Sequence, residues 1–387
     1  MKRSTDRILT THTGSLPRPP ELLELFSERM DGREVDAALL RERASAAVAD
    51  AVRRQVEAGI DVVSDGEMGK IGFANYVQDR MTGFGGEVSS RSFARDVGDF
   101  PDFGARMAAG NQSAMRMPRP SNDAEITYVG HEQLEGDLAA MRAAMSTVQA
   151  EEAFLPAASP GCVVQVMPST HYPDRRAYLY GLADALRVEY RAIVDAGFTL
   201  QVDCPDLAMG RHWEFADATL EEFRKNLALH IEALNHGLEG VDPEHVRVHV
   251  CWGNYPGPHH RDVALRDILD LIYEVRANGI SIEGANPRHE HEWTVFADMP
   301  LPEGRYLIPG VIDSCTNYVE HPELVAQRIV RFAQVVGREN VVAGTDCGFG
   351  TFAGFGAVVP GIAYAKLASL GEGARIASRE LWGEAEP

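Results

Sequence analysis

His249 and Cys251 stand two residues apart in a short apolar stretch, residues 246–251, and both side chains are types that bind zinc. Valine occupies every second position of this stretch, and such a period of two predicts a β-strand with His249 and Cys251 on one face. The pair can supply half of a tetrahedral metal site. A buried cysteine packed beside a hydrogen-bonded histidine has the same pattern, so the choice depends on what else the fold brings to this point.

Predicted strands and helices must position this pair. Along the chain, short apolar runs rich in β-branched residues alternate with segments whose apolar residues have helical spacing. Strands are expected at 8–13, 60–64, 162–167, 199–203, 246–251, 280–283, 306–313 and 340–345. Helices are expected at 35–57, 133–154, 175–196, 220–237, 263–278, 322–336 and 356–370. Strands that alternate with helices favour parallel pairing through right-handed crossovers.

Eight such strands predict an α/β fold, a closed (β/α)8 TIM barrel, with a doubly wound open sheet as the rival architecture. Residues 70–135 break the alternation because they contain many glycines and prolines among polar residues. We interpret this segment as a long insertion after the second strand. The length of 387 residues is compatible with one large barrel domain over residues 1–387.

Composition limits the classes of function. The net charge of -20 argues against a nucleic-acid partner or an anionic membrane surface, which both require a basic face. The 5 cysteines are an odd number spread over a long chain, which favours a reducing cytoplasm over a disulfide framework. No apolar run follows the basic N-terminal residues, so no signal peptide is expected, and no run of about 18 apolar residues predicts a membrane span.

The carboxyl ends of barrel strands open onto one mouth, where the chemistry of such barrels takes place. Glu283 and Cys347 follow the predicted strands six and eight, so they should meet His249 and Cys251 there. One imidazole, one carboxylate and two thiolates make a sensible tetrahedral Zn²⁺ site. Such an electron-rich zinc activates water poorly but can hold a substrate thiol as a nucleophilic thiolate.

Six short motifs lie at or near these strand ends. They are Gly14-Ser15-Leu16-Pro17, Asp65-Gly66-Glu67, Val202-Asp203, His249-Val250-Cys251, Ile282-Glu283 and Asp346-Cys347-Gly348. Together, over roughly residues 5–370, they resemble the catalytic domain of the cobalamin-independent methionine synthases. The resemblance implies a zinc-bearing (β/α)8 barrel that methylates the thiol of homocysteine with methyltetrahydrofolate.

The same resemblance assigns expected roles to individual residues. It implies zinc ligation by His249, Cys251, Glu283 and Cys347. It also implies that Glu67 and Asp203 bind the ammonium group of homocysteine and that Ser15 contacts its carboxylate. Glu67 and Asp203 can instead be structural carboxylates in a turn and at a strand end. Of the two interpretations, we favour substrate binding.

The sequence also departs from the family pattern. The chain has no counterpart of the N-terminal barrel of the plant and enteric enzymes, Cys204 stands where that family has Glu, and residues 116–120 match its folate-contacting insertion only loosely. Shorter relatives include the epoxyalkane:coenzyme M transferases, which open an epoxide with a different thiol. The methyl or alkyl donor therefore stays open between methyltetrahydrofolate and another electrophile.

The sequence thus predicts a zinc-dependent thiol methyl- or alkyltransferase whose partners are a small homocysteine-like thiol and a carbon donor. Epoxide opening by coenzyme M is one alternative, and a non-catalytic zinc-binding barrel is the other. Two carboxylates at Glu67 and Asp203 suit an ammonium group better than a sulfonate. The leaving group needs a proton, for which His171 and Asp313 are candidates, although Asp313 can equally cap the next element. A homo-oligomer is compatible with the sequence.

Overall fold

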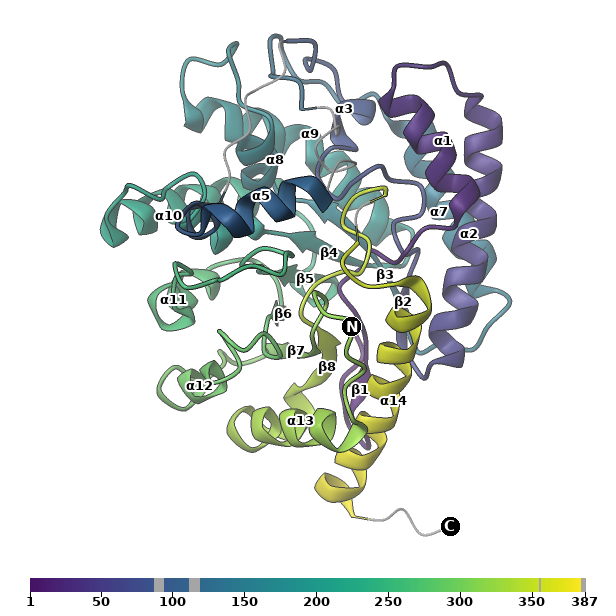
Figure 1. Ribbon diagram of the computed structural model, residues 1–387, viewed down its shortest axis with the longest axis vertical. Coiled ribbons are helices and arrows are strands. Elements are labelled where there is room, and N and C mark those ends of the chain that lie inside the picture. Colours follow the sequence, from purple (N-terminus) through teal and green to yellow (C-terminus); the bar gives the residue numbers. More distant parts are fainter. Residues whose placement is uncertain (87–93, 111–118, 355, 384–387) are drawn as a thin grey trace.

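The computed structural model of the protein describes residues 1–86, 94–110, 119–354 and 356–383. Its centre is a ring of eight parallel strands in the spatial order β1-β8-β7-β6-β5-β4-β3-β2 (Figure 1). The strands are β1 Leu9–Thr10, β2 Val62–Ser64, β3 Glu152–Ala158, β4 Thr199–Asp203, β5 Val246–His249, β6 Gly279–Ile282, β7 Tyr306–Ile312 and β8 Val342–Thr345.

The ring is closed between β1 and β2 by side-chain and backbone hydrogen bonds rather than by a regular ladder. The Asp61 amide donates to the Thr10 carbonyl at 3.2 Å, and the Thr10 amide donates to the Asp61 carboxylate at 2.8 Å. The nearly closed ring is a (β/α)8 barrel, so the predicted fold class is confirmed and the open-sheet alternative is excluded.

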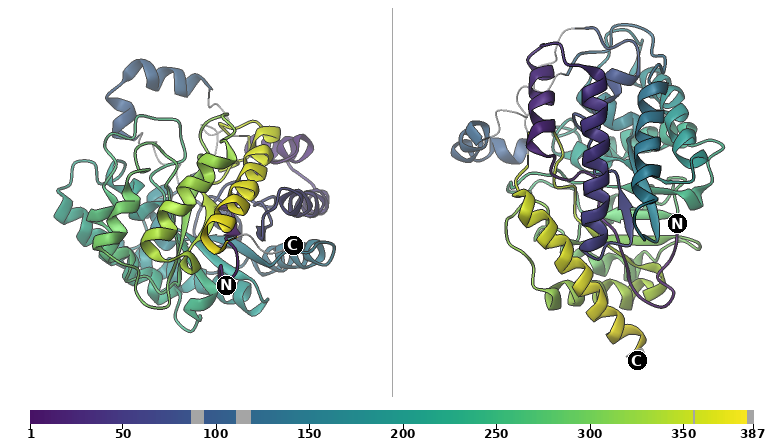
Figure 2. Two further views of the ribbon diagram at one scale, coloured as in Figure 1. Left: turned by 90° about the horizontal axis from the view of Figure 1, so that it is seen from below. Right: turned by 90° about the vertical axis from the view of Figure 1, so that its right-hand side faces the viewer.

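The chain forms helices, most of which pack around the outside of the ring, as Figures 1 and 2 show. They are α1 Pro20–Met30, α2 Ala37–Glu57, α3 Val77–Arg80, α4 Arg95–Gly98, α5 Pro101–Gly110, α7 His131–Met145, α8 Pro160–Val166, α9 Arg175–Asp195, α10 Leu220–Gly237, α11 Leu269–Ile272, α12 Val295–Asp298, α13 Pro322–Val336 and α14 Pro360–Trp382. Local signals set several of their ends: Asp36 caps α2, and Thr219 with Glu222 forms a capping box on α10.

The third strand lies elsewhere than predicted. Of residues 162–167, all but Met167 belong to helix α8, because Ser159 caps its first turn by accepting the Cys162 amide and Pro160 occupies the first helical position. The strand is β3, part of which we expected inside a helix over 133–154. It has few β-branched residues and contains Pro156, and both features hide a strand from pattern recognition.

The segment 263–278 is also not the single helix that we expected. Only a 3-10 turn at Leu265–Asp267 and the short α11 form there. The amide of Arg276 donates to the Asn235 side chain, and the amide of Asn278 donates to the Pro243 carbonyl. These bonds compete with continuation of the helix.

The barrel interior is partly polar. Arg247 of β5 is fully buried, donates to Gln201, Thr11 and the His12 carbonyl, and stacks 3.4 Å over the Phe154 ring. The buried apolar side chains form one large cluster, whose members lie between Ile8 and Ala377 along the chain. Within the described residues, no helix has the length and apolar character needed to cross a membrane.

The described parts of the 70–135 insertion extend over the mouth of the barrel. Short bridges tie this segment to the body, among them Asn122 to Ser169 and Gly72 to Phe352. Helices α4 and α5 stand out from the body on the side of the mouth (Figure 2). The insertion therefore lies where it can contribute to a site at the strand ends.

Candidate functional site

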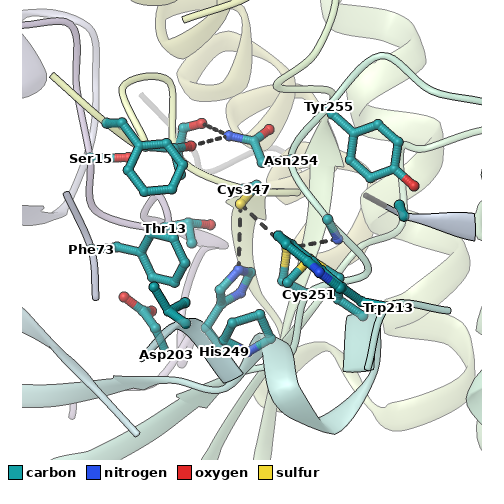
Figure 3. Close-up of a pocket in the computed structure, with 18 of the residues that line it drawn as sticks. Thr13, Ser15, Phe73, Asp203, Trp213, His249, Cys251, Asn254, Tyr255 and Cys347 are labelled. Carbon is teal, nitrogen blue, oxygen red and sulfur yellow. Dashed lines mark hydrogen bonds between the residues drawn. The ribbon is translucent and has the colours of Figure 1, made fainter. Parts of the chain in front are cut away.

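A cavity of about 210 Å³ lies at the mouth of the barrel, and Figure 3 shows its lining. Its polar walls come from the barrel strands and the loops that follow them, and its apolar walls come from those loops and from the insertion. The lining residues are Thr13, Ser15, Glu67, Phe73, Ala94, Val97, Met107, Ala108, Arg119, Val166, Asp203, Pro205, Met209, Trp213, His249, Cys251, Gly253, Asn254, Tyr255, Cys347, Gly348, Thr351 and Phe352.

Three of the four expected metal ligands meet in this cavity. His249 is the last residue of β5, Cys251 lies two residues beyond it, and Cys347 lies two residues beyond β8. The Sγ atoms of Cys251 and Cys347 are 3.6 Å apart, and Cys347 Sγ is 3.8 Å from His249 Nε2. All three ligand atoms lie within 4.8 Å of one another.

The separations of 3.6 and 3.8 Å fit a tetrahedral zinc ion. Bond lengths of about 2.3 Å to sulfur and about 2.0–2.1 Å to nitrogen place the ligand atoms of such an ion about 3.5–3.8 Å apart. The donor set of two sulfurs and one imidazole nitrogen is also one that zinc prefers. His249, Cys251 and Cys347 can therefore hold zinc with a fourth position left for another ligand, which is typical of catalytic zinc sites.

Neighbouring groups orient these side chains. The Ser281 hydroxyl lies 3.3 Å from His249 Nδ1, which leaves Nε2 facing the thiols, and the Gly253 amide donates to Cys251 Sγ at 3.2 Å. Burial lowers the pKa of His249 to about 3, so the imidazole is neutral as a metal ligand must be. The contact with Cys251, together with burial, raises the pKa of the Cys347 thiol well above its usual value.

Glu283, the fourth expected ligand, lies beside the cluster but is not part of the compact set. Its Oε1 accepts the Trp252 amide at 2.8 Å, and its Oε2 accepts the Asn286 side-chain amide at 2.9 Å. Both carboxylate oxygens therefore have partners on neighbouring loops. Zinc ligation by Glu283 stays a prediction, and it is compatible with both bonds because each carboxylate oxygen has a second lone pair.

The carboxylates Glu67 and Asp203 both line the cavity and are both buried. Asp203 ends β4 and pairs in register with His249 of β5, and Gln201 donates to its Oδ1 at 2.8 Å. Burial raises the pKa of Glu67 to about 7, and burial together with the nearby Glu67 raises that of Asp203. Burial outweighs the charge of the nearby Lys70, which acts in the opposite direction on both groups, so both carboxyls resist ionisation.

Glu67 is held in a sharp turn after β2 with a φ of 56°. A side chain at Gly14 would place its Cβ 3.0 Å from Glu67 Oε1, so the Gly14 turn leaves room for this carboxylate. Glu67 Oε2 is buried and has no hydrogen-bond partner among the described residues. An unpartnered carboxylate oxygen on a cavity wall is suited to accept a hydrogen bond from a cationic ligand.

Ser15 lines the cavity where the loops after β1 and β8 meet. Its Oγ accepts the Gly350 amide at 3.4 Å, and its carbonyl accepts the Phe349 amide at 2.7 Å. A Cβ on Gly348 would lie 2.0 Å from Ser15 Oγ, so this close approach requires glycine. Ser15 therefore stands beside Cys347, where contact with a substrate carboxylate remains a prediction.

The two candidate proton donors are placed outside the cavity lining. The Asp313 carboxylate accepts the amides of Cys315 and Thr316 at 3.0 and 2.8 Å, so it caps the turn after β7. His171 is exposed and packs edge-on against Tyr172 in the loop after α8. A catalytic role for either residue stays a prediction.

Sequence reasoning missed several lining residues. Asn254 donates to the Gly348 carbonyl at 2.7 Å and to Thr351 Oγ1 at 2.6 Å, so it joins the loops that carry Cys251 and Cys347. Its place three residues after Cys251 was the available signal. Of the loosely matching segment 116–120, residues 116–118 lie outside the described residues, whereas Arg119 lines the cavity.

The family described as "Cobalamin-independent synthase, Catalytic domain" matches residues 141–359, more than half of the chain and a range that includes Asp203 and all four expected metal ligands. The chain belongs to this family. The resemblance carried by the six motifs is therefore confirmed.

Relatives of the family match nearly the whole chain. A 2-hydroxypropyl-CoM lyase of Xanthobacter autotrophicus is 26% identical over 97% of this chain and 96% of its own length. A methionine synthase of Thermococcus kodakarensis is 25% identical over 96% of this chain and 94% of its own length.

Solved structures share the fold. A B12-independent methionine synthase from Shewanella sp. W3-18-1, in complex with selenomethionine, superposes with a TM-score of 0.74 at 19% identity, covering 97% of this chain and 99% of that chain. A B12-independent methionine synthase assigned in Listeria monocytogenes gives a TM-score of 0.62 at 17% identity, covering 98% of this chain and 100% of that chain. These likenesses show that the chain shares the fold of these structures.

Proposed function

We propose that the protein is a zinc-dependent transferase that joins a carbon from a methyl or alkyl donor to the sulfur of a small thiol bearing an ammonium group, as homocysteine does. The observation that carries the proposal is the shared cavity, in which a zinc-compatible cluster and two buried carboxylates line one mouth. Asp203 and His249 stand on adjacent strands in direct register, so a thiol and an ammonium group a few bonds apart can reach both.

Each part of the cavity has a role in this proposal. Zinc bound by His249, Cys251 and Cys347 would act as a Lewis acid that keeps a substrate sulfur deprotonated and nucleophilic at neutral pH. Glu67 and Asp203 would accept hydrogen bonds from the ammonium group and so fix the direction of the sulfur. Ser15 would contact the carboxylate of the thiol.

The reaction is a displacement at carbon. The thiol loses its proton, the sulfur forms a bond to the donor carbon, and the bond from that carbon to its leaving atom breaks. The leaving atom retains the electron pair and takes up a proton. Holding the two reactants in one small cavity supplies the approach geometry. Asp313 and His171 lie outside the described lining, and proton transfer by either residue stays a prediction.

A second candidate, alkyl transfer to a sulfonate thiol, is favoured by one observation. The relative from Xanthobacter autotrophicus is by its name a 2-hydroxypropyl-CoM lyase, and it is as similar to this chain as the methionine synthases are. A sulfonate needs cationic partners, and Arg119 is the one Lys or Arg side chain among the described lining residues. The buried carboxylates favour the amino-thiol.

Thiol binding to the cobalt(II)-substituted protein tests the proposal, because a thiol that joins the metal changes its visible absorption. The panel consists of homocysteine, 4-mercaptobutanoate, which lacks the ammonium group, and 2-mercaptoethanesulfonate. We expect homocysteine to bind at least tenfold more tightly than the other two. The Glu67→Gln, Asp203→Asn double variant should lose this preference while it keeps the affinity for 4-mercaptobutanoate.

Two results would count against the proposal. Tighter binding of 2-mercaptoethanesulfonate than of homocysteine would favour the sulfonate candidate. A spectrum that no thiol alters, in a protein that holds one cobalt ion, would remove the thiol-activation role altogether.

A further inference from the structure

Several side chains on the cavity wall carry protons, and one of them is a phenol. Leaving aside the metal cluster and the two carboxylates assigned to the ammonium group, the described lining residues with an O–H or N–H side chain are Thr13, Ser15, Arg119, Trp213, Asn254, Tyr255 and Thr351. A phenol, with an ordinary pKa of about 10, is more acidic than an aliphatic hydroxyl, an amide or an indole, and a guanidinium keeps its proton in proteins. Tyr255 is thus the strongest neutral acid of this set.

The loop after β5 is shaped around the Tyr255 ring. A Cβ at Gly253 would lie 2.6 Å from this ring, and a Cβ at Gly257 would overlap it, so both positions require glycine. The ring also stacks on the imidazole of His259, with ring centroids 4.5 Å apart. His259 itself has a φ of 54°, a left-handed conformation that is uncommon for a residue other than glycine. This close packing holds the phenol in one orientation.

The stacked imidazole carries a positive charge. His259 Nδ1 lies 2.9 Å from the Asp262 carboxylate and Nε2 lies 3.0 Å from the Tyr255 carbonyl, and because both partners are acceptors, both ring nitrogens donate. Burial opposes the charge, but the hydrogen bond to Asp262 outweighs it and raises the pKa of His259 to about 9. A cation against the phenol ring favours negative charge on Tyr255 once its proton has left.

The Tyr255 hydroxyl stands between two polar side chains. It donates to Asp96 at 2.7 Å, and His212 Nε2 lies 3.3 Å from the same oxygen. Asp96 also accepts the amides of Val97 and His259 at 2.8 and 2.9 Å, so this carboxylate stays hydrogen-bonded when the hydroxyl turns away from it. Burial and the bond to Asp96 raise the pKa of Tyr255, so the resting phenol is protonated at neutral pH.

His212 connects this hydroxyl to a buried carboxylate. Its Nδ1 lies 3.2 Å from Asp262 Oδ1, and both side chains are fully buried. An imidazole between a hydroxyl and a carboxylate can pass a proton at one nitrogen while the carboxylate stabilises the cationic ring. The order of phenol, imidazole and carboxylate therefore gives Tyr255 a route by which it can regain a proton.

We infer that Tyr255 is the catalytic acid that protonates the leaving atom of the carbon donor, and that His212 returns the proton. The inference rests on the proposed function, because it concerns the proton of the same reaction. In Figure 3 the metal cluster lies between Asp203 and Tyr255, so a thiol that extends from the metal toward Asp203 leaves the Tyr255 side for the leaving atom.

The proton and the electrons balance in this step. The sulfur forms its bond to carbon, the bond from that carbon to the leaving atom breaks, and the freed electron pair takes the phenolic proton of Tyr255. The phenolate then regains one proton from solvent through His212. The thiol has released one proton to solvent, so the reaction has no net proton demand and needs no oxidant or reductant.

Two kinds of donor separate proton transfer from positioning. The donors 1,2-epoxypropane and 5-methyltetrahydrofolate triglutamate leave an oxygen or a nitrogen that needs a proton, whereas iodomethane leaves iodide, which needs none. The zinc-loaded full-length protein is assayed with homocysteine and each donor by mass spectrometry, and the rate with Cys347→Ala is subtracted as background. We expect Tyr255→Phe to lower kcat by about 100-fold or more with each proton-requiring donor that the wild-type protein uses, and by less than about threefold with iodomethane.

Two further variants serve as control and as a test of the relay. Tyr273→Phe removes a tyrosine hydroxyl outside the described lining, one that donates to the Met299 carbonyl at 2.9 Å, and should leave every rate within about twofold of wild type. His212→Gln should lower kcat with a proton-requiring donor about tenfold, with unchanged KM for homocysteine and an unchanged iodomethane rate. A merely structural role of His212 would lower both kinds of rate together.

The outcomes distinguish this inference from the proposed function. Equal losses with both kinds of donor in Tyr255→Phe, or no loss with a proton-requiring donor, would overturn the inference. Zinc content and the homocysteine-induced change in the cobalt spectrum should match wild type in this variant. If homocysteine changes the cobalt spectrum of the wild-type protein but only iodomethane reacts, the thiol site stands and the inference fails. If homocysteine leaves that spectrum unchanged, the proposed function itself fails.

Discussion

Asp203 and His249 are register partners on the neighbouring strands β4 and β5, so a buried carboxylate stands directly beside a zinc-compatible imidazole. Parallel pairing brings both residues to the carboxyl ends of their strands, and both line the same cavity. In the proposed binding mode, the distance between the sulfur and the ammonium group of the thiol would be set by one strand spacing of about 4.8 Å. This spacing suits a thiol whose sulfur and nitrogen are separated by a short carbon chain.

The first prediction concerns the metal ligands. Cys347→Ala should weaken zinc binding by more than about 100-fold, because it removes one of three compactly placed donors. Zinc per chain, measured by plasma emission spectroscopy after equilibration with a chelator, checks this. Cys204→Ala is the matched control, since Cys204 is buried outside the cluster, and it should retain the metal. Equal zinc in both variants would place the metal elsewhere.

The second prediction concerns Ser281, which contacts the far nitrogen of His249 at 3.3 Å. Ser281→Ala leaves the imidazole free to rotate and should lower zinc affinity roughly 10-fold, as is usual when a group that orients a metal ligand is removed. Competition with a chromogenic chelator gives the affinity. Ser378→Ala, on the C-terminal helix α14, should not change it.

The third prediction is a pH dependence of thiol binding. Burial raises the pKa of Glu67 to about 7, so this carboxyl is ionised above pH 7 and neutral below. An ammonium group prefers the ionised form. Homocysteine affinity should therefore be highest above pH 7 and fall as the pH drops through 7, by up to about tenfold per pH unit for one proton.

The comparison thiol for this measurement is 4-mercaptobutanoate, which shares the titration of the thiol but lacks the amine. Calorimetric titrations of both thiols between pH 5.5 and 8.5 give the ratio of affinities. A ratio that does not change with pH would show that Glu67 does not bind the ammonium group.

The fourth prediction concerns stability. Because the folded pKa of Glu67 lies above the ordinary value of 4.5, its favourable contribution is complete below pH 4.5 and is lost as the pH rises through about 7. Glu67→Gln should therefore increase the free energy of unfolding on the order of 1–3 kcal/mol at pH 8 and much less at pH 5. Urea unfolding at the two pH values checks this, with Glu24→Gln on the exposed side of α1 as the control.

The fifth prediction concerns Gln201, which links the barrel interior to the cavity. Arg247 donates to the Gln201 carbonyl oxygen at 2.8 Å and so turns the Gln201 amide nitrogen toward Asp203. Gln201→Leu frees Asp203 and leaves that bond of Arg247 unmade. We expect homocysteine affinity to fall roughly tenfold while zinc content stays at the wild-type level. A parallel loss of zinc would indicate general disruption of the barrel.

The sequence predicted the site correctly where a recognisable strand pattern ends in side chains that can bind metal. The β-branched runs at β4, β5 and β8 mark strands, and parallel strands in a barrel must open on one mouth. That rule is enough to bring His249, Cys251 and Cys347 together, because it depends on strand order and not on side-chain packing. The family resemblance rested on the same strand ends.

The pattern failed at the third strand for a local reason. Cys162, Val163 and Val164 have strand-forming side chains, yet the Ser159 cap and Pro160 begin a helix there. The true strand contains Pro156 and alanines, so its place is decided by pairing with β2 and β4 on either side. Tertiary pairing overrides local preference at such a position.

The amino-acid sequence by itself determined the barrel, the family and the side chains that a zinc site needs, because these follow from periodicity and from residue types at strand ends. Only the tertiary structure decided that the Glu283 carboxylate is engaged by Trp252 and Asn286, that Asp313 caps a turn, and that α4 and α5 cover the mouth with apolar residues. The contact between Trp252 and Glu283 and the apolar cover of the mouth depend on loops distant in sequence, and no local pattern encodes those. The Asp313 cap uses amides two and three residues along the chain, so the sequence could offer it only as one of two roles.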